Sequence, residues 1–136
     1  MNVRVRAAWT VAAVAAATTG CILAVAGAGA GGGIYFTSRG AEGVVPASIA
    51  RATAATTRAF GDLKIKRTNV EEERGDRSER REVSGQTHNE TVDVTVTLQP
   101  ESSRSTRVQV VARKSAVTWD REFARKVLGK IVAYSR

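Results

Sequence analysis

The chain has 136 residues, of which 21 are lysine or arginine and 13 are aspartate or glutamate, so its formal net charge is +8 at pH 7. This length leaves room for one domain, and the basic balance favours anionic partners such as lipid head groups, cell-wall polymers or nucleic acid. A single cysteine and a single histidine exclude a disulfide framework within one chain and a cysteine-rich zinc site.

The N-terminal part of the sequence has the layout of an export or anchoring segment. Two arginines precede an uncharged apolar run at 7–17, and three small residues then lead to Cys21. A basic start, a short apolar stretch and small residues at its exit are the parts of a secretory signal peptide. Residues 1–20 are therefore predicted to be a signal peptide of the lipoprotein type, with Cys21 as the residue that carries acyl chains such as palmitate.

Two other forms of this segment remain open. Thr18 stands where lipoprotein signals usually have leucine, and the stretch 7–36 is uncharged and longer than the roughly 20 residues that span a bilayer, so an uncleaved membrane anchor is the main rival. The glycine-rich run at 27–33 disfavours a helix there. An ordinary cleaved signal peptide is the third form. With either anchor, residues 21–45 are expected to be an apolar Gly/Ala-rich tether, and 46–136 a small basic domain.

The first element expected in this domain is a helix. Pro46 suits a first helical turn and Gly61 suits a helix end, which predicts a helix over 47–60. Residues with three- to four-residue spacing define the face expected to be buried, namely Ile49, Thr53, Thr56, Phe60 and Leu63.

Four strands are predicted next, over 63–73, 82–88, 91–98 and 104–114. The charged stretch 71–82 is predicted to be a solvated turn between the first two strands. The alternation is clearest in the third strand, where Val92, Val94, Val96 and Leu98 share one face, and Val108, Val110 and Ala112 do so in the fourth. One apolar and one polar face are typical of an antiparallel sheet.

A second helix is predicted to begin after Thr118, with Asp120 in its first turn. Its apolar stripe consists of Trp119, Phe123, Val127, Ile131 and Tyr134, and Trp119 and Phe123 are expected to fill the core. Basic residues cover the other face, namely Arg121, Arg125, Lys126, Lys130 and Arg136. The predicted fold is α+β in the order α-β-β-β-β-α, a four-stranded antiparallel meander with both helices on one face.

The sequence offers little catalytic chemistry. His88 is the only histidine, so a Ser-His-acid triad would rest on it alone. The acidic residues at 71–76 lie among basic ones, and the glycine run lacks the Lys-Ser/Thr of a phosphate-binding loop. We therefore predict a protein that is not an enzyme, with no cofactor and no metal.

Several segments resemble a family of small bacterial predicted lipoproteins that is defined only as a domain of unknown function. The resemblance rests on Cys21 after small residues, the Gly/Ala run ending near Tyr35 and Phe36, the alanine-rich helix from Pro46 to Phe60, the strands at 92–100 and 106–111, and the segment 123–131. It implies an envelope location and a small α+β domain, and it brings no catalytic residue. The chain departs from the pattern at Thr18 and in the charged stretch 71–82.

The sequence favours a membrane-tethered structural or interaction module of the cell envelope, on the periplasmic side of the outer membrane in a Gram-negative cell. Its expected partners are the membrane, through lipid on Cys21 or an N-terminal helix, and an envelope protein or anionic polymer. The alternative is a single-pass anchored protein that binds anionic lipid or cell-wall polymer through the basic helix face. A nucleic-acid-binding domain is less favoured, because the exposed positions of 91–98 are threonine or aspartate and export removes the nucleic acid.

Overall fold

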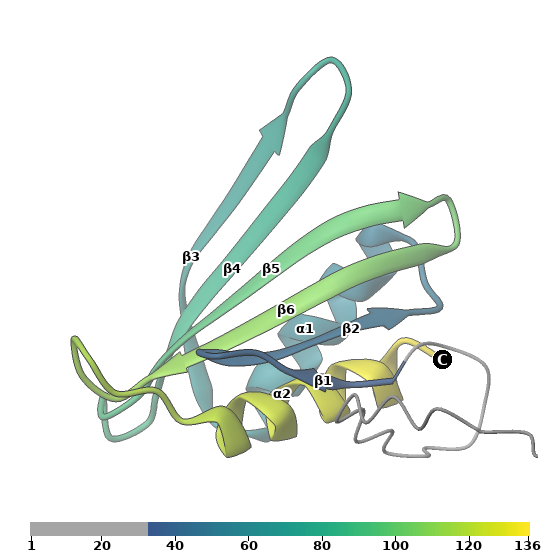
Figure 1. Ribbon diagram of the computed structural model, residues 1–136. Coiled ribbons are helices and arrows are strands. Elements are labelled where there is room, and N and C mark those ends of the chain that lie inside the picture. The colour runs from purple at the N-terminus through teal and green to yellow at the C-terminus, as the bar shows by residue number, and fades with distance from the viewer. Residues whose placement is uncertain (1–32) are drawn as a thin grey trace, which may run out of the picture.

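A computed structural model describes residues 33–136, so the predicted signal segment and Cys21 lie outside the described residues. The described chain forms a six-stranded antiparallel sheet and two helices (Figure 1). The strands are β1 (Tyr35–Phe36), β2 (Gly40–Val45), β3 (Ile65–Arg74), β4 (Glu79–Thr87), β5 (Asp93–Ser102) and β6 (Ser105–Arg113), and the helices are α1 (Ile49–Asp62) and α2 (Arg121–Tyr134). The predicted α+β class is confirmed.

The sheet is larger than the predicted four-stranded meander. Its order is β1-β2-β6-β5-β4-β3, so the meander β3 to β6 is present and two further strands extend it at the β6 side. β2 pairs with β6 from Gly40 opposite Val111 to Val45 opposite Thr106. The boundary expected at Pro46 is therefore wrong, because residues 35–45, assigned to the tether, contribute two strands.

The small residues of β2 explain why its sequence gives a weak strand signal. A Cβ atom placed on Gly40 would lie 1.9 Å from the carbonyl oxygen of Val110, and one on Gly43 would lie 3.3 Å from the carbonyl oxygen of Gly33. Glycine is used where another segment of backbone approaches this closely. These positions therefore have little room for the β-branched residues by which strands are usually recognised.

Helix α1 begins later than predicted. Ser48 is its N-cap, and the Ser48 Oγ accepts a 3.3 Å hydrogen bond from the backbone N–H of Arg51. Pro46 therefore precedes the helix instead of lying in its first turn. Five residues form the buried side of α1, namely Ala52, Ala55, Thr56, Ala59 and Phe60. Three members of the predicted face, Ile49, Thr53 and Leu63, are only half-buried, because alanines form much of the face that meets the sheet.

The predicted core faces of β5 and β6 are confirmed except at Val92, which precedes β5 and is only half-buried. Val94, Val96 and Leu98 are fully buried, as are Val108, Val110 and Ala112. Both helices cover this face of the sheet, with α1 and α2 also packed against each other (Figure 1). Helix α2 contributes the buried residues Ala124, Val127, Leu128 and Ile131.

The second helix begins at Arg121, and Trp119 lies before it. Asp120 is the N-cap in place of Thr118, since its carboxylate accepts a 2.9 Å hydrogen bond from the backbone N–H of Phe123. Trp119 instead forms an isolated antiparallel bridge with Arg113 and is half-buried. Its expected place in the core is therefore wrong, because the four-residue spacing only aligns it with the stripe if it is helical. Phe123 packs against the core from a partly buried position.

The stretch 71–82, predicted to be a solvated turn, is mostly strand. β3 continues to Arg74 and β4 starts at Glu79, so the two strands form a long hairpin that projects from the sheet (Figure 1). Opposite charges face each other across it, as in the register pairs Glu72 with Arg81 and Glu73 with Arg80. Such cross-strand pairs stabilise a hairpin that buries little apolar surface.

Among residues 33–136, neither helix has the length and the apolar character that crossing a membrane requires.

Candidate functional site

One surface of the domain gathers cations around aromatic rings. We call it the basic face and define it as Phe36, Arg39, Trp119, Arg121, Arg125 and Lys126. The residues come from β1, the turn that leads into β2, the residue before Asp120, and the first turns of α2. β1 and α2 lie together at one side of the molecule (Figure 1), so this face forms beside the first strand of the described chain.

The arginines of this face lie against aromatic rings. The guanidinium carbons of Arg121 and Arg125 are 6.0 and 5.8 Å from the centre of the Phe36 ring, and that of Arg39 is 5.3 Å from the Trp119 ring. A cation within about 6 Å of a ring is attracted to its π-face, by roughly 0.5–1 kcal/mol at an exposed position. The rings thus help to position the arginines while leaving N–H groups of each guanidinium available to an anion.

Most of the positive charge of this face is not neutralised locally. In the described part of the chain, no carboxylate lies within ion-pair distance of Arg39, Arg121 or Lys126. Arg125 has one long contact, 3.9 Å from its Nη1 to Glu122 Oε2, and the Glu122 side chain is 79% exposed. A contact of this kind contributes little.

The predicted basic side of the last helix is only partly assembled. Lys130 Nζ lies 3.6 Å from Asp62 Oδ2, at the C-terminal end of α1, so its charge is paired within the fold. The backbone carbonyl of Arg136 accepts a 2.7 Å hydrogen bond from Arg51, away from the start of α2. The structure therefore brings Arg121 and Arg125 together at the Phe36 ring, while Lys126 borders the same outer side of α2 as Arg125.

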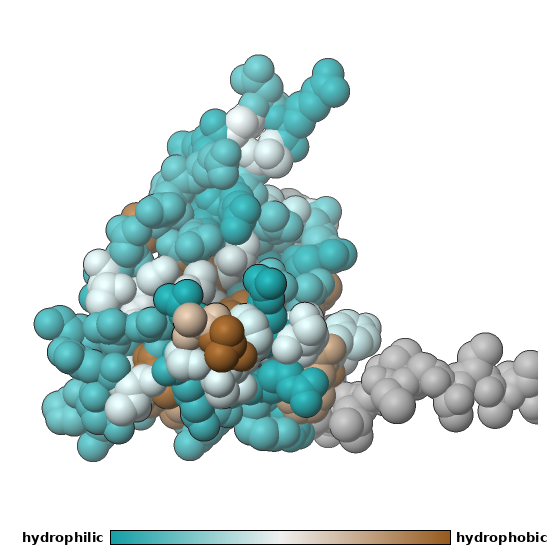
Figure 2. Space-filling model, turned by 60° about the vertical axis from the view of Figure 1, so that its left-hand side comes forward, coloured by the Kyte–Doolittle hydropathy of each residue, from teal (hydrophilic) through white to brown (hydrophobic). Residues whose placement is uncertain are grey.

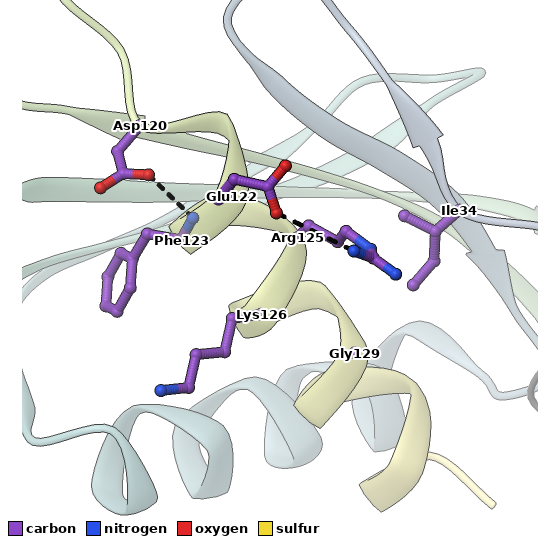
Figure 3. Close-up of a pocket in the computed structure, with 7 residues that line it drawn as sticks. All are labelled: Ile34, Asp120, Glu122, Phe123, Arg125, Lys126 and Gly129. Carbon is purple, nitrogen blue, oxygen red and sulfur yellow. Dashed lines mark hydrogen bonds and ion pairs between the residues drawn. The ribbon is translucent and has the colours of Figure 1, made fainter. Parts of the chain in front are cut away.

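An open depression runs along the outer side of α2 (Figure 3). Its lining residues are Ile34, Asp120, Glu122, Phe123, Arg125, Lys126 and Gly129. Arg125 extends towards Ile34, whereas Phe123 and Lys126 project on the other side of the helix. Gly129 leaves space, since a Cβ atom there would meet nothing within 4 Å. A hollow this open can contact a surface but cannot enclose a small substrate away from water.

Asp120 borders this depression in a structural role. The backbone N–H of Phe123 donates a hydrogen bond to it, and Lys114 Nζ lies 3.0 Å from its Oδ2. Both interactions favour the ionised form, so the pKa of Asp120 is lowered from its ordinary value, chiefly by the hydrogen bond from Phe123. The carboxylate therefore serves as the N-cap of α2.

The hairpin carboxylates also have structural partners. The Arg81 side chain is only 14% exposed and lies between Glu72 and Glu79, at 3.3 and 3.2 Å. Its Nε atom lacks the alignment of a hydrogen bond to Glu72, so that contact is electrostatic. Arg81 Nη1 also lies 3.4 Å from Thr53 Oγ1, which links the hairpin to α1.

The side chains that could bind a metal ion are scattered over the described part of the chain. His88 is exposed in the turn between β4 and β5. Within residues 33–136, no group of three or more His, Cys, Asp or Glu side chains is placed to hold a metal ion.

The open face of the sheet carries charges of both signs. Arg107 forms ion pairs with Glu101 and, at 3.6 Å, with Glu42. It borders a shallow polar hollow whose other lining residues are Glu42, Arg80, Thr97, Gln99 and Gln109. Because arginine and glutamate alternate there, this face lacks the one-signed charge that attracts a polyanion.

Apolar surface is scattered over the described residues. Figure 2 shows a face that is mostly hydrophilic, with small separate apolar areas. The large hydrophobic side chains that are exposed lie in β1, in β3 and in the loop between β6 and α2, namely Tyr35 at 44%, Val70 at 41% and Val117 at 78%. Separated residues of this kind do not form the broad patch that marks an apolar protein interface.

The sequence prediction missed the β1 half of the basic face. Phe36 and Arg39 lie in the segment that was expected to be a tether. The available signal was an aromatic pair, Tyr35 and Phe36, followed closely by an arginine at the end of a long uncharged stretch.

Comparison with known proteins identifies a family without an assigned role. No curated protein matches the sequence. Residues 4–133 match the family described as "Protein of unknown function (DUF3568)". The match covers nearly the whole chain, including the charged hairpin and both helices. The chain therefore belongs to the family described as Protein of unknown function (DUF3568).

Proposed function

We propose that this protein is a membrane-tethered, non-catalytic interaction module of the cell envelope, anchored through lipid on Cys21 or through an uncleaved apolar segment. The observation that carries the proposal is the direct junction between apolar segment and domain. The uncharged stretch 7–36 ends in β1, whose Tyr35 and Phe36 pair with Glu42 and Ala41 of β2. An anchor in this stretch would therefore hold the sheet close to a bilayer.

The number of residues between Cys21 and the domain limits how far the domain can lie from the membrane. From Cys21 to Gly33 there are twelve residue steps, which reach at most about 43 Å when fully extended. With lipid on Cys21, the domain would stay within this distance of the membrane surface. In a Gram-negative cell, that surface would be the periplasmic side of the outer membrane.

The non-catalytic part of the proposal is supported by the roles of the charged side chains. Asp120 caps a helix, Arg81 joins the hairpin to α1, and Arg107 bridges two glutamates. These groups are engaged in holding elements together. The cations of the basic face remain for binding.

The test is mass spectrometry of the mature N-terminus, combined with fractionation of cells that express the full chain. Acyl mass on an N-terminal Cys21 would support the lipid anchor, and an intact Met1 in the membrane fraction would support the uncleaved anchor. A protein cleaved after residue 20, without lipid and outside the membrane fraction, would overturn the tether.

Cys21→Ala separates the two anchored forms. If lipid is the anchor, the variant should remain unprocessed or leave the lipoprotein fraction. Cys21→Ala that fractionates like the parent, with no acyl mass on the parent, would show that the uncleaved segment is the anchor.

A further inference from the structure

We infer that the basic face is the surface through which the domain lies on anionic lipid head groups, so that the module has a fixed orientation on its membrane. The inference deepens the proposed function and rests on the tether. Its support comes from the place of this face in the fold, its charge, and its side-chain chemistry.

The place of the face follows from the start of the described chain. Ile34 lines the depression on α2, and Phe36 lies two residues further on, within 6.0 Å of the Arg121 and Arg125 guanidinium groups. A chain that leaves the membrane and enters the domain at Gly33 would therefore pass beside the middle of α2, where Arg125 extends towards Ile34. The surface next to an anchor point is the surface that meets the bilayer most often.

The chemistry of the face suits phosphate head groups. Arginine binds phosphate oxygens through paired N–H groups, and each Lys or Arg near an anionic surface contributes about 1 kcal/mol, or roughly a fivefold bias in population. Trp119 adds an amphipathic ring of the kind that favours the membrane interface. Three carboxylates lie near the face. Asp120 is paired with Lys114, Asp93 shares a hollow with Arg39 and Trp119 but lies 3.5 Å from Arg113, and Glu122 is exposed beside Arg125.

A lipid surface fits this face better than a protein partner does. Protein interfaces have an apolar centre from which charged residues are depleted. The basic face instead has three arginines against two partly exposed rings, and Lys126 borders an open depression beside them. The orientation would point the β3–β4 hairpin, at the other end of the molecule in Figure 1, away from the membrane.

The experiment uses the full chain with Trp9→Phe, which leaves Trp119 as the only tryptophan. The protein is incorporated into vesicles of phosphatidylcholine, or of phosphatidylcholine and phosphatidylglycerol in equal parts, each with a trace of dansyl-labelled lipid. Energy transfer from Trp119 to dansyl then reports how close the face lies to the head groups. We expect greater transfer in the anionic vesicles, and loss of the difference at high salt, because salt screens exposed charges.

Arg121→Glu combined with Lys126→Glu tests the face itself. With a fivefold bias per cation, loss of the two positive charges should reduce the face-down population by about 25-fold, and their replacement by negative charge should reduce it further. The matched control is Arg74→Glu with Arg77→Glu, which changes the net charge equally at the exposed hairpin. Circular dichroism checks the folding of each variant. If the reversal unfolds the domain, Arg121→Gln with Lys126→Gln should still remove the two cations.

The outcomes separate the two proposals. Attachment to both kinds of vesicle with equal transfer would overturn the basic face and leave the tether standing. Attachment to anionic vesicles only, abolished by the Arg121 and Lys126 changes, would support the face and contradict an apolar tether. Failure to attach to either would contradict both. An equal loss in the hairpin control would show that net charge, not this face, binds the lipid.

Discussion

The hydroxyl group of Thr106 on β6 donates a buried 2.8 Å hydrogen bond to the backbone carbonyl oxygen of Ala47. Thr106 is fully buried and Ala47 is 4% exposed. Ala47 lies in the connection between β2 and α1, and its own N–H donates to the Val45 carbonyl oxygen at 2.9 Å. The bond therefore links the last residues of β2 and the entry to α1 to the strand beside them.

Thr106→Val removes this hydroxyl group with little change in shape. We expect the free energy of unfolding to fall by about 1–3 kcal/mol, because the Ala47 carbonyl oxygen would lose its partner while buried. Thr106→Ser keeps the hydroxyl group, so its free energy of unfolding should fall less. Chemical denaturation of the two variants measures the difference, and a Thr106→Val midpoint equal to that of the parent would show that the bond does not stabilise the fold.

Two glycines should respond to alanine with opposite signs. A Cβ atom on Gly85 of β4 would lie 2.7 Å from Ile65 Cγ2, 2.8 Å from the Lys66 carbonyl oxygen and 2.9 Å from Phe60 Cε2, so Gly85→Ala should cost about 1–3 kcal/mol. Gly129 lies inside α2 with open space around it, so Gly129→Ala should stabilise by up to about 1 kcal/mol. Thermal unfolding of both variants tests the pair. A stable Gly85→Ala would contradict the close packing of α1 on β4.

Acid should remove the stability that the ionised Asp120 carboxylate gives to the fold. Its pKa in the folded protein lies below the ordinary value, chiefly because the Phe123 N–H bonds to the carboxylate. The stability that its charge provides is therefore present above the unfolded pKa of about 3.9, and it is lost as the pH falls through the folded pKa.

Asp120→Asn keeps a capping oxygen and removes the charge, so it isolates this effect. The parent should exceed the variant by roughly 0.3–1 kcal/mol near neutral pH, and the two should converge in strong acid. Unfolding midpoints measured across this pH range provide the check. A difference that stays constant in strong acid would mean that the charge is not its source.

Phe60 and Trp119 should contribute very differently to stability, because Phe60 lies in the core and Trp119 lies on the basic face. Phe60 is 2% exposed, and Phe60→Ala should cost about 3–5 kcal/mol or prevent folding. Trp119 is half-buried outside the core, with Arg39 over its ring, so Trp119→Ala should cost far less. Denaturation of both variants compares them. If Trp119→Ala lowered the free energy of unfolding as much as Phe60→Ala, Trp119 would have to be part of the core.

The β5–β6 core and the presence of two helices follow from the local sequence pattern. In β5 and β6, alternate residues point to opposite sides of the sheet, so the valines of 94–98 and 108–110 share the buried face once these segments are extended. The last helix has a stripe of apolar residues three and four positions apart, which identifies a helix whatever lies next to it. These features depend on residues that are close together along the chain, so the sequence alone is enough to predict them.

The start of α2 and the membership of β2 in the sheet depend on contacts that a local pattern does not contain. β2 pairs with β6, more than sixty positions away, and Gly40 is required by the close approach of the Val110 carbonyl group, not by a preference for strand. Likewise, Asp120 begins α2 while Trp119 pairs with Arg113.

The same reason applies to the basic face. Arg121 and Arg125 are recognisable as exposed helix cations, whereas Phe36 and Arg39 join them only because β1 folds back against β2 beside α2. The sequence thus identifies the charged residues of the face. Their convergence on one surface was decided by the tertiary structure, since pairing between distant segments depends on packing and not on the preference of any single residue.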